Sequence, residues 1–390
     1  RNELRRVDDS PLLAQLSARD YAADQANMLL GRYLTSLPRG QLMRVGLAAD
    51  NPDGAARLFR LMAWDCSGRY RQRVQQQAAM PAGEGLRVRF ALPQLFEQQC
   101  LRLQSLPPSP SETGTWHLQG LSVAVDTDLE RTVATIRQSR ASAELDSGAA
   151  LPPAIAHAGG ALDGRTYTNA IAALEQHYAR GVRWFELDFQ WTADGHLVCG
   201  HDWGPTLPAA LRQADDAPST LAQFEQATAG ETHLPCTLAQ LRDWLQSRPD
   251  ARIVTDLKLR ALDGLAILAE QIPNHAQRLV AQVYQPQQLA QARALGYADI
   301  LWTLYRYPGD TPQVLAALTN ITPLAVTMDQ KRLAQGLGLV LQRAGVPVYV
   351  HTVNDAQIAA ESVANWGAVG VYSDILAADD AGDAGVVAWE

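Results

Sequence analysis

The chain has 390 residues, a length that exceeds one small domain and predicts two or three domains. Its hydrophobic content of 47% is ordinary for a globular protein and excludes a disordered or collagen-like chain. The formal net charge of −8 argues against nonspecific nucleic-acid binding, because such binding requires a basic face. An acidic chain can still take a phosphate substrate, since a bound divalent cation reverses the local charge.

No apolar run approaches the roughly 20 residues that a membrane-spanning helix needs. Because the numbering starts at Arg1 rather than at methionine, we expect that a signal peptide or membrane anchor was removed, with Arg1–Arg6 as its polar flank. The four cysteines lack the paired CxxC spacing of a zinc site and fall two in each half: Cys66, Cys100, Cys199 and Cys236. They allow either one disulfide in each half, which would favour a periplasmic or cell-envelope location, or four buried free thiols.

Residues 1–150 predict an accessory domain made of a helical lead-in and a β-sandwich. Apolar residues recur at helical intervals from Asp9 to Leu34, which favours one or two helices. Short alternating runs separated by turn residues then predict antiparallel strands at Gln41–Leu47, Arg57–Trp64, Leu86–Leu92, Cys100–Ser105 and Thr115–Val125, with turns at Ala49–Gly54 and Pro107–Gly114. The segment Leu129–Ala150, which is rich in polar and small residues, is expected to be a helix and linker.

Residues 151–390 change to a repeating pattern of strand, loop and helix. We expect strands at Ala154–Ala156, Arg183–Phe189, His196–Gly200, Arg252–Leu257, Leu279–Val283, Ile300–Leu304, Leu324–Met328, Val348–Val353 and Val369–Tyr372. Helices are expected at Asn169–Arg180, Leu238–Gln246, Leu262–Ile272, Pro286–Leu295, Thr311–Leu318, Arg332–Ala344 and Asp355–Trp366. Repeated units of this kind imply a parallel sheet, and their number predicts a TIM (β/α)8 barrel, which typically takes about 250 residues. A doubly wound sheet is the alternative, but no GxGxxG follows the first strand.

Polar residues gather where the predicted barrel strands end, the usual place for function in this fold. His157 follows the first strand, Glu186 and Asp188 lie two apart on the second, and His201 ends the short return strand. Asp256 and Lys258 repeat the two-residue spacing, which places both side chains on one face of a strand. Burying three carboxylates without a cation would cost several kcal/mol, so the pattern predicts one divalent ion. Oxygen ligands favour Ca²⁺ or Mg²⁺ over zinc.

The order of these residues resembles the glycerophosphodiester phosphodiesterase family, a relative of the phosphatidylinositol-specific phospholipase C barrels. The resemblance rests on a series that runs through the whole predicted barrel: H157-A-G-G, T-N169, F-E186-L-D188, D194-G, H201-D202, T-D256-L-K258, H-T352-V-N354 and Y-S-D374. No single piece is specific, and the combination in this order carries the resemblance.

The resemblance implies a metal-dependent phosphodiesterase that works by two-histidine acid–base catalysis. His157 and His201 would deprotonate a substrate hydroxyl next to the phosphodiester and protonate the leaving oxygen, through a cyclic phosphate. Glu186, Asp188 and Asp256 would hold the cation, which neutralises charge on the phosphoryl oxygens. Lys258, one of only two lysines in the chain, would direct a positive charge at the phosphate or at the carboxylates.

Three departures from the family pattern concern the substrate pocket. The family usually has arginine where this chain has Ala158, so we expect Arg165 or the backbone N–H groups of the glycine-rich turn to replace a phosphate clamp. Asp256 stands where glutamate is usual and is one methylene shorter, which would leave room for a bridging water. His351 stands in place of a tryptophan.

Further pocket residues are expected from their positions beside these motifs. Tyr284 and Tyr305 end apolar strands, Trp203 lies just beyond His201, and each either contacts substrate or packs in the core. His351 ends a strand and could line the pocket. Asn169 begins a helix, so it either supports the active site or serves as an N-cap.

The leading hypothesis is therefore an enzyme that cleaves a phosphodiester bearing a neighbouring hydroxyl. Its substrate would be a small phosphodiester, a phospholipid headgroup or a phosphoglycan, and nucleic acid is not expected. The alternative is a catalytically inactive or weak envelope protein that binds carbohydrate or phosphoglycan. The N-terminal strands loosely resemble the carbohydrate-binding β-sandwich modules of polysaccharide enzymes, although a purely structural sandwich would give the same pattern.

Overall fold

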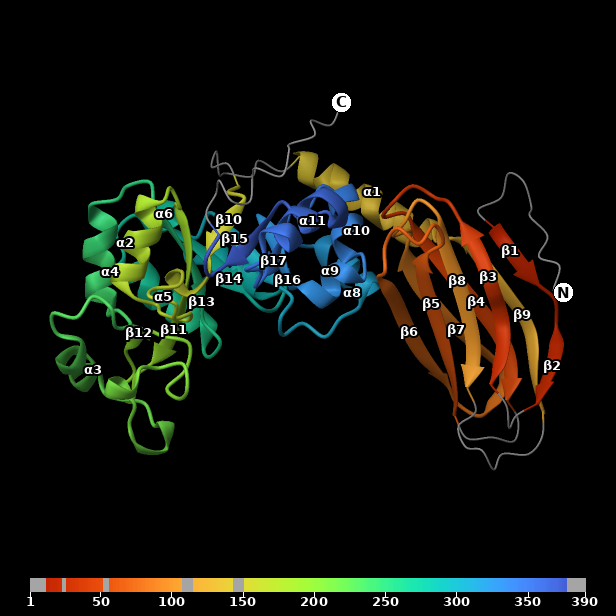
Figure 1. The fold of residues 1–390 in the computed structure, drawn as a ribbon, viewed down its shortest axis with the longest axis horizontal. Coiled ribbons are helices and arrows are strands. Elements are labelled where there is room, and N and C mark those ends of the chain that lie inside the picture. The colour runs from red at the N-terminus through yellow and green to blue at the C-terminus, as the bar shows by residue number, and fades with distance from the viewer. Residues whose placement is uncertain (1–11, 23–25, 52–55, 107–114, 143–150, 377–390) are drawn as a thin grey trace. The chain divides into compact units, whose positions relative to one another are not determined.

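The computed structural model describes residues 12–22, 26–51, 56–106, 115–142 and 151–376 (Figure 1). The chain divides into two compact units, one built mainly from residues up to Arg137 and the other mainly from the residues that follow. The predicted boundary between residues 150 and 151 borders a segment outside the described residues. The polar flank Arg1–Arg6 and the turn Pro107–Gly114 also lie outside them.

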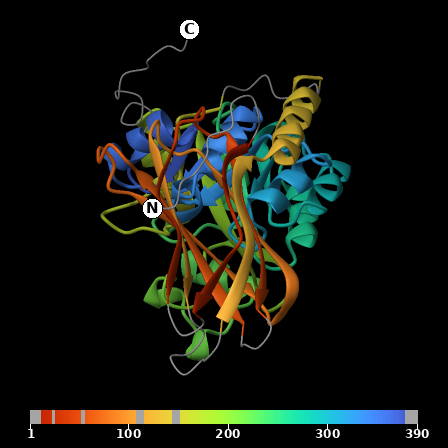
Figure 2. The same cartoon turned by 90° about the vertical axis from the view of Figure 1, so that its right-hand side faces the viewer.

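The first unit consists of antiparallel strands, coloured red to orange in Figures 1 and 2. One sheet has the order β1-β9-β4-β7, with β2 also paired to β9, and the other has the order β3-β8-β5-β6. The strands are β1 (Leu12–Leu16), β2 (Arg19–Ala22), β3 (Asn27–Thr35), β4 (Leu42–Asn51), β5 (Arg57–Asp65), β6 (Arg73–Met80), β7 (Gly83–Pro93), β8 (Gln99–Leu106) and β9 (Thr115–Val125). Helix α1 (Thr127–Ser142) follows.

Strict alternation of buried and half-exposed residues in β4 and β5 gives each sheet one apolar face. The inner faces of both sheets contribute to a single core, in which the buried Trp116 ring stacks on Tyr21 at 4.9 Å and meets Phe59 edge-on at 5.7 Å. The predicted sandwich is confirmed as a β-rich unit of antiparallel sheets.

The helical lead-in predicted from Asp9 to Leu34 is wrong over the described residues. This stretch forms β1, β2 and β3 instead, and β3 pairs with β8 from Asn27 to Thr35. Helix propensity is a weak local preference, and hydrogen bonding to β8 and β9 together with burial of Leu29 and Leu30 overrides it. Strand β6 was also not predicted, because its Gln-rich sequence shows little hydrophobic alternation.

The second unit contains a closed barrel of eight parallel strands, coloured yellow to blue in Figure 1. Strand β10 pairs with both β11 and β18, which closes the barrel, and β12 adds antiparallel to β11. The eight strands are β10 (Ala154–Ala156), β11 (Trp184–Trp191), β13 (Arg252–Asp256), β14 (Leu279–Val283), β15 (Ile300–Thr303), β16 (Ala325–Asp329), β17 (Val348–His351) and β18 (Gly370–Ser373); β12 is Leu197–Cys199. The predicted TIM barrel is confirmed.

Helices alternate with these strands along the chain, and several begin at side-chain caps. Thr220 and Thr237 each form a reciprocal capping box with the glutamine three residues later, and Asp355 caps the last helix. The helices are α2 (Ile171–Ala179), α3 (Leu221–Thr228), α4 (Leu238–Gln246), α5 (Ala261–Gln271), α6 (His275–Arg278), α7 (Gln288–Ala294), α8 (Thr311–Leu318), α9 (Gln330–Ala334), α10 (Leu337–Arg343) and α11 (Ala356–Trp366), with short 3-10 turns at His157–Gly159, Ala209–Leu211 and Ala214–Asp216.

The helices differ from the sequence prediction in several details, among them the short helix α6, which was not predicted. The helix expected over Arg332–Ala344 breaks into α9 and α10 at Gly336, whose φ of +88° is left-handed and suits glycine. Helix α3 was not predicted, because it is short and lies within the long connection from β12 to α4. No helix of the described residues is long and apolar enough to span a membrane.

All four cysteines are paired, and each unit holds one disulfide: Cys66–Cys100 joins the sandwich strands, and Cys199–Cys236 joins β12 to the start of α4. Of the two possibilities that the sequence left open, the structure therefore has the disulfides.

Candidate active site

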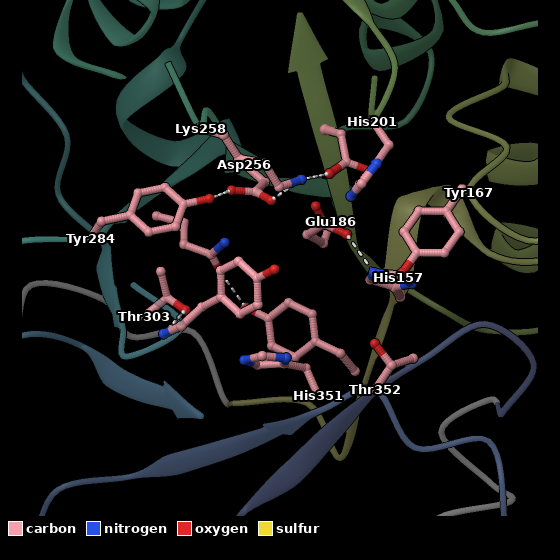
Figure 3. Close-up of a pocket in the computed structure, with 14 residues that line it drawn as sticks. His157, Tyr167, Glu186, His201, Asp256, Lys258, Tyr284, Thr303, His351 and Thr352 are labelled. Atoms are coloured by element: carbon pink, nitrogen blue, oxygen red, sulfur yellow. Dashed lines mark hydrogen bonds and ion pairs between the residues drawn. The ribbon is translucent and has the colours of Figure 1, made fainter. Parts of the chain in front are cut away.

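The predicted catalytic and metal-binding residues meet in one pocket at the carboxyl ends of the barrel strands (Figure 3). The strand register explains part of this convergence, because Asp188 on β11 lies directly opposite Asp256 on β13. Glu186 precedes Asp188 by two residues and so points to the same side of β11. The antiparallel return of β12 then brings His201 back over this strand end, with Gly200 N donating to Asp188 O at 2.9 Å.

The three carboxylates of Glu186, Asp188 and Asp256 form a compact buried cluster. One oxygen from each lies within 4.8 Å of the other two, and each residue is at most 9% exposed. Burial and the neighbouring charge of Asp188 hold the pKa of Glu186 well above its ordinary value. A proton or a cation is therefore needed to stabilise Glu186 in this cluster.

Each carboxylate is oriented by a hydrogen bond from a different element. Ala158 N donates to Glu186 at 2.7 Å, and Tyr284 OH donates to Asp256. The Asn169 side chain donates to Asp188 Oδ2 at 3.1 Å and accepts from Asp188 N at 2.9 Å. Such outer partners fix ligand geometry in metal sites.

Lys258 neutralises part of the charge of this cluster. Its Nζ lies 2.6 Å from Asp188 Oδ1 and 3.0 Å from Asp256 Oδ2. Burial on its own would lower the pKa of Lys258, but the charges of Asp256 and Asp188 raise it above the ordinary value. The ammonium is therefore charged at neutral pH, and one lysine against three carboxylates leaves a formal charge of −2.

His157 is held by a carboxylate from the last barrel strand. Its Nδ1 lies 2.8 Å from Asp374 Oδ1, and because a carboxylate only accepts, the shared proton is on Nδ1. Asn354 Nδ2 donates to the second oxygen of Asp374 at 2.7 Å and so fixes its position. Burial would lower the pKa of His157, but the hydrogen bond with Asp374 and the charge of Glu186 raise it to about 9.

His201 has a corresponding partner in its neighbour Asp202. His201 Nδ1 lies 3.1 Å from Asp202 Oδ2, while Asp202 Oδ1 accepts from Gly204 N at 2.8 Å. Burial would raise the pKa of Asp202, but hydrogen bonds from His201 and Thr206 outweigh burial and lower it. Asp202 thus both orients the imidazole and caps the following turn.

Tyr167 lies between the two histidines, with ring centroids 4.9 Å from His157 and 4.7 Å from His201 (Figure 3). It belongs to a connection with several left-handed residues, including Ala158 at φ +48° and Asn169 at φ +47°. Hydrogen bonds hold this backbone in place, among them Asn169 N to Ala158 O at 2.8 Å. No sequence pattern pointed to Tyr167 beyond its place two residues before Asn169.

Three other residues predicted to contact substrate do line the pocket: Tyr284, Tyr305 and His351. Tyr305 is 62% exposed and marks the mouth of the pocket, whereas His351 is largely buried, with no hydrogen-bond partner for Nε2 among the described residues. Burial lowers the pKa of His351 to about 4, so the imidazole is neutral near pH 7.

Arg165, Trp203 and Asn169 do not line the pocket. Arg165 is exposed in a tight turn paired to Leu162. Trp203 is buried in a small apolar cluster with Phe224, and its indole donates to Trp191 O. Asn169 is fully buried behind the carboxylates and acts on Asp188 rather than on substrate.

The glycine-rich turn does not offer a free set of backbone donors either. Ala158 N bonds Glu186, Gly160 N bonds His157 O, and Ala161 N bonds Asp374 O. Arg165 and the N–H groups of Ala158, Gly160 and Ala161 therefore do not form the expected clamp, because Arg165 faces solvent and these three donors are already paired.

Three pocket residues were missed at the sequence level, namely Tyr167, Gln282 and Thr303, while Thr352 and Tyr372 belonged to the quoted motif without an assigned role. Gln282 and Thr303 are polar residues near the ends of otherwise apolar strands, and this position was a usable signal. Asp374 belonged to the quoted motif, but only the fold shows that it bonds His157.

A parallel barrel with paired histidines facing an acidic cluster at the strand ends defines a hydrolase-type site for phosphate esters. The model of the glycerophosphoryl diester phosphodiesterase family matches residues 157–378, which is more than half of the chain. The chain therefore belongs to the glycerophosphoryl diester phosphodiesterase family, and it is an enzyme of that class. No curated protein matches it.

Solved structures similar to this chain come from the same class of enzyme. A glycerophosphodiester phosphodiesterase from Parabacteroides distasonis is 19% identical with a TM-score of 0.45, covering 57% of this chain and 92% of its own. The Thermotoga maritima enzyme is 17% identical with a TM-score of 0.44, covering 58% and 96%. A phosphodiesterase from Oleispira antarctica, solved in complex with the product sn-glycerol-3-phosphate, is 21% identical with a TM-score of 0.44, covering 57% and 93%.

Proposed function

We propose that this chain hydrolyses a glycerophosphodiester-like bond with His157 and His201 as general acid and base and with one divalent cation held by Glu186, Asp188 and Asp256. The observation that supports this most directly is the convergence of both histidines and the three carboxylates on one pocket. The Tyr167 ring contacts both imidazoles and occupies the space between them on one side of that pocket.

The donor set fits a hard divalent cation. Glu186, Asp188 and Asp256 supply only carboxylate oxygens, the ligands that Ca²⁺ and Mg²⁺ prefer. The formal charge of −2 that remains after Lys258 is counted equals the charge that such an ion balances. When bound, the ion would supply positive charge to the phosphoryl oxygens of the substrate.

Proton transfer is assigned to the two histidines. With Nδ1 of each bonded to Asp374 or Asp202, the Nε2 atom of each ring is left for the substrate. One histidine removes the proton from a substrate hydroxyl, whose oxygen attacks phosphorus, and the other donates a proton to the departing oxygen. A cyclic phosphate results, and water opens it with the two roles reversed, so the net reaction adds one water across a P–O bond.

Neutral polar residues in the pocket suit a substrate rich in hydroxyl groups. Gln282, Thr303 and His351 present neutral hydrogen-bonding groups there. Because Ala158 stands in place of the arginine, Lys258 and the cation would balance the negative charge of the phosphate. Because Tyr305 at the mouth is largely exposed, a leaving group can extend into solvent. Small glycerophosphodiesters, phospholipid headgroups and phosphoglycans share this bond, and we propose the small diesters as the first substrates to test.

The decisive experiment compares two substrates with and without a hydroxyl beside the phosphate. We expect hydrolysis of glycerophosphocholine in the presence of Ca²⁺ or Mg²⁺, with a transient cyclic phosphate visible by ³¹P NMR. Bis(p-nitrophenyl) phosphate lacks that hydroxyl and should react much more slowly. His157→Ala and His201→Ala should each lower kcat by about 10²-fold or more.

An exposed histidine on the same barrel, His233, provides the matched control, and His233→Ala should retain wild-type rates. Equal rates on both substrates without a cyclic product would contradict the cyclic mechanism, while activity unchanged by EDTA would contradict the cation. Wild-type activity no higher than that of His157→Ala would overturn the proposed function altogether.

A further inference from the structure

An arginine-rich hollow lies on the outer face of the sheet β3-β8-β5-β6, within the first unit and apart from the barrel pocket. Its volume is about 620 Å³, and its lining includes Arg32, Arg71, Arg73 and Arg102 together with Trp64 and Asp65. Nothing in the phosphodiesterase reaction requires this hollow, so its chemistry points to a separate role.

The strand register brings the guanidinium groups around one tryptophan. Arg73 on β6 lies directly opposite Trp64 on β5, and Arg102 on β8 lies opposite Met62 with its guanidinium 5.5 Å from the Trp64 ring centroid. Arg32 reaches over from β3 to the Cys66–Cys100 disulfide, donating to Cys66 O at 3.2 Å. Arginines from three strands therefore line the same hollow as the half-buried indole.

These charges are poorly compensated within the described residues. Asp65 is the one carboxylate that lines the hollow, and its oxygens accept from the Ser67 hydroxyl and from Tyr70 N rather than from arginine. The side chains of Arg71 and Arg73 are exposed and form no hydrogen bond or ion pair with the described residues, while Arg102 Nε is buried without a hydrogen-bond partner there. The hollow thus carries an excess of positive charge.

The two halves of the chain also differ in their balance of basic and acidic residues. Residues 1–150 contain 18 arginines and 16 acidic residues, whereas residues 151–390 contain 15 basic and 25 acidic residues. The positive hollow therefore lies in the basic part of an acidic chain, and charge complementarity favours an anionic ligand there.

The lining also indicates which kind of anion fits. An indole face beside guanidinium groups suits a sugar ring that carries acidic groups, because the ring packs on Trp64 while its anions pair with arginine. The sheet face continues with amide side chains, Gln75 opposite Met62 and Gln77 opposite Arg60, which match sugar hydroxyls.

Two other polyanions fit less well. A bilayer presents a flat surface, whereas these arginines line a hollow. The Cys66–Cys100 disulfide at its edge is typical of an oxidising compartment, where nucleic acid is not the abundant polyanion. We propose that this hollow binds an acidic oligosaccharide, stacked on Trp64 and held by Arg71, Arg73 and Arg102.

The test is calorimetric titration of the full-length chain with a hexamer of galacturonic acid and with its neutral counterpart, a galactose hexamer. We expect binding of the acidic hexamer alone. Arg71→Gln with Arg73→Gln should weaken it at least tenfold, because both side chains are exposed and can change without disturbing the core. The matched control is Arg44→Gln with Arg87→Gln, the same charge change on the outer face of the other sheet, which should weaken binding less than twofold.

Trp64→Leu separates ring stacking from simple charge attraction. It should weaken the acidic hexamer at least fivefold but leave binding of tripolyphosphate, an anion without rings, unchanged. The proposal is overturned if the hexamer does not bind, if both double variants weaken it equally, or if Trp64→Leu affects tripolyphosphate as much. It is also overturned if single-stranded DNA or phosphatidylglycerol vesicles at equal charge bind more tightly than the hexamer.

Discussion

Asp374 shows how a single side chain outside the pocket can govern the chemistry inside it. It does not line the pocket, yet it bonds Nδ1 of His157 and is itself held by Asn354. The carboxylate thereby keeps a proton on Nδ1 of His157 and, in the proposed mechanism, leaves Nε2 for the substrate.

We therefore expect Asp374→Asn to lower kcat about 10²-fold or more while leaving KM within about twofold, because an amide can donate to Nδ1 and favour the wrong tautomer. Steady-state kinetics on glycerophosphocholine would show this. Asp243→Asn, which alters an exposed carboxylate paired with Arg242, should leave both constants unchanged. A parallel rise in KM for Asp374→Asn would instead indicate a role in binding.

His177 is a buried histidine that the proposed reaction does not use. Its Nε2 lies 3.0 Å from Ala161 O, and its ring packs so closely against Gly160 that a Cβ there would come within 2.3 Å. Burial lowers the pKa of His177; the hydrogen bond to Ala161 and the charge of Asp374 oppose that shift, whereas the charge of Arg180 adds to it. The folded protein thus binds this proton less readily than the unfolded chain.

The sign follows from linkage: below the unfolded pKa near 6.5, the unfolded state holds more protons, so stability falls as pH falls. The contribution of His177 to this slope is at most about 1.4 kcal/mol per pH unit. His177→Gln, which keeps a donor for Ala161 O, should make the free energy of unfolding less sensitive to pH between 7.5 and 5.5. Urea unfolding at several pH values measures this, and an unchanged slope would refute the prediction.

At the scale of whole elements, the β11–β12 hairpin and the disulfide after it connect the His201 loop to the carboxylate cluster. Cys199 lies two residues before His201 and is bonded to Cys236, whose N–H donates to Asn169 O at 2.9 Å. Asn169 in turn orients Asp188. The cross-link therefore holds the base of the His201 loop against the residue that positions a carboxylate.

Comparison of the two disulfides separates stability from catalysis. Their sequence separations are 34 and 37 residues, so the loss of either should lower stability by a similar amount, about 2–4 kcal/mol. We expect Cys199→Ala with Cys236→Ala to lower kcat at least tenfold at a temperature where the protein stays folded. Cys66→Ala with Cys100→Ala should leave kcat unchanged, and equal losses of activity in both variants would contradict a positioning role.

At the scale of the whole molecule, cation binding should appear as stability. A ligand that binds only the folded state at about 100 times its Kd adds about 2.7 kcal/mol. We expect millimolar Ca²⁺ or Mg²⁺ to raise the Tm of the barrel transition by several degrees, and Glu186→Gln to abolish that shift. Differential scanning calorimetry provides a readout that does not depend on activity, and a shift of the same size in Glu186→Gln would contradict this ligand set.

The barrel could be predicted from sequence more completely than the sandwich. Its strands are short apolar runs between amphipathic helices, and segments such as Leu279–Val283 have the predicted bounds. The N-terminal strands β1 to β3 were predicted as helix because their local sequence favours that state and only pairing with β8 and β9 overrides it. The domain boundary at residues 150 and 151 stays a prediction.

The sequence by itself determined the barrel class, the family, and the two histidines and three carboxylates that meet in the pocket, because strand-end positions and two-residue spacing translate directly into one face of one sheet. Only the tertiary structure decided that Asp374 holds His157, that Tyr167 lies between the histidines, that Arg165 faces solvent, and that the cysteines pair. These contacts join segments far apart in the chain, and long-range packing rather than local pattern decides which of them meet.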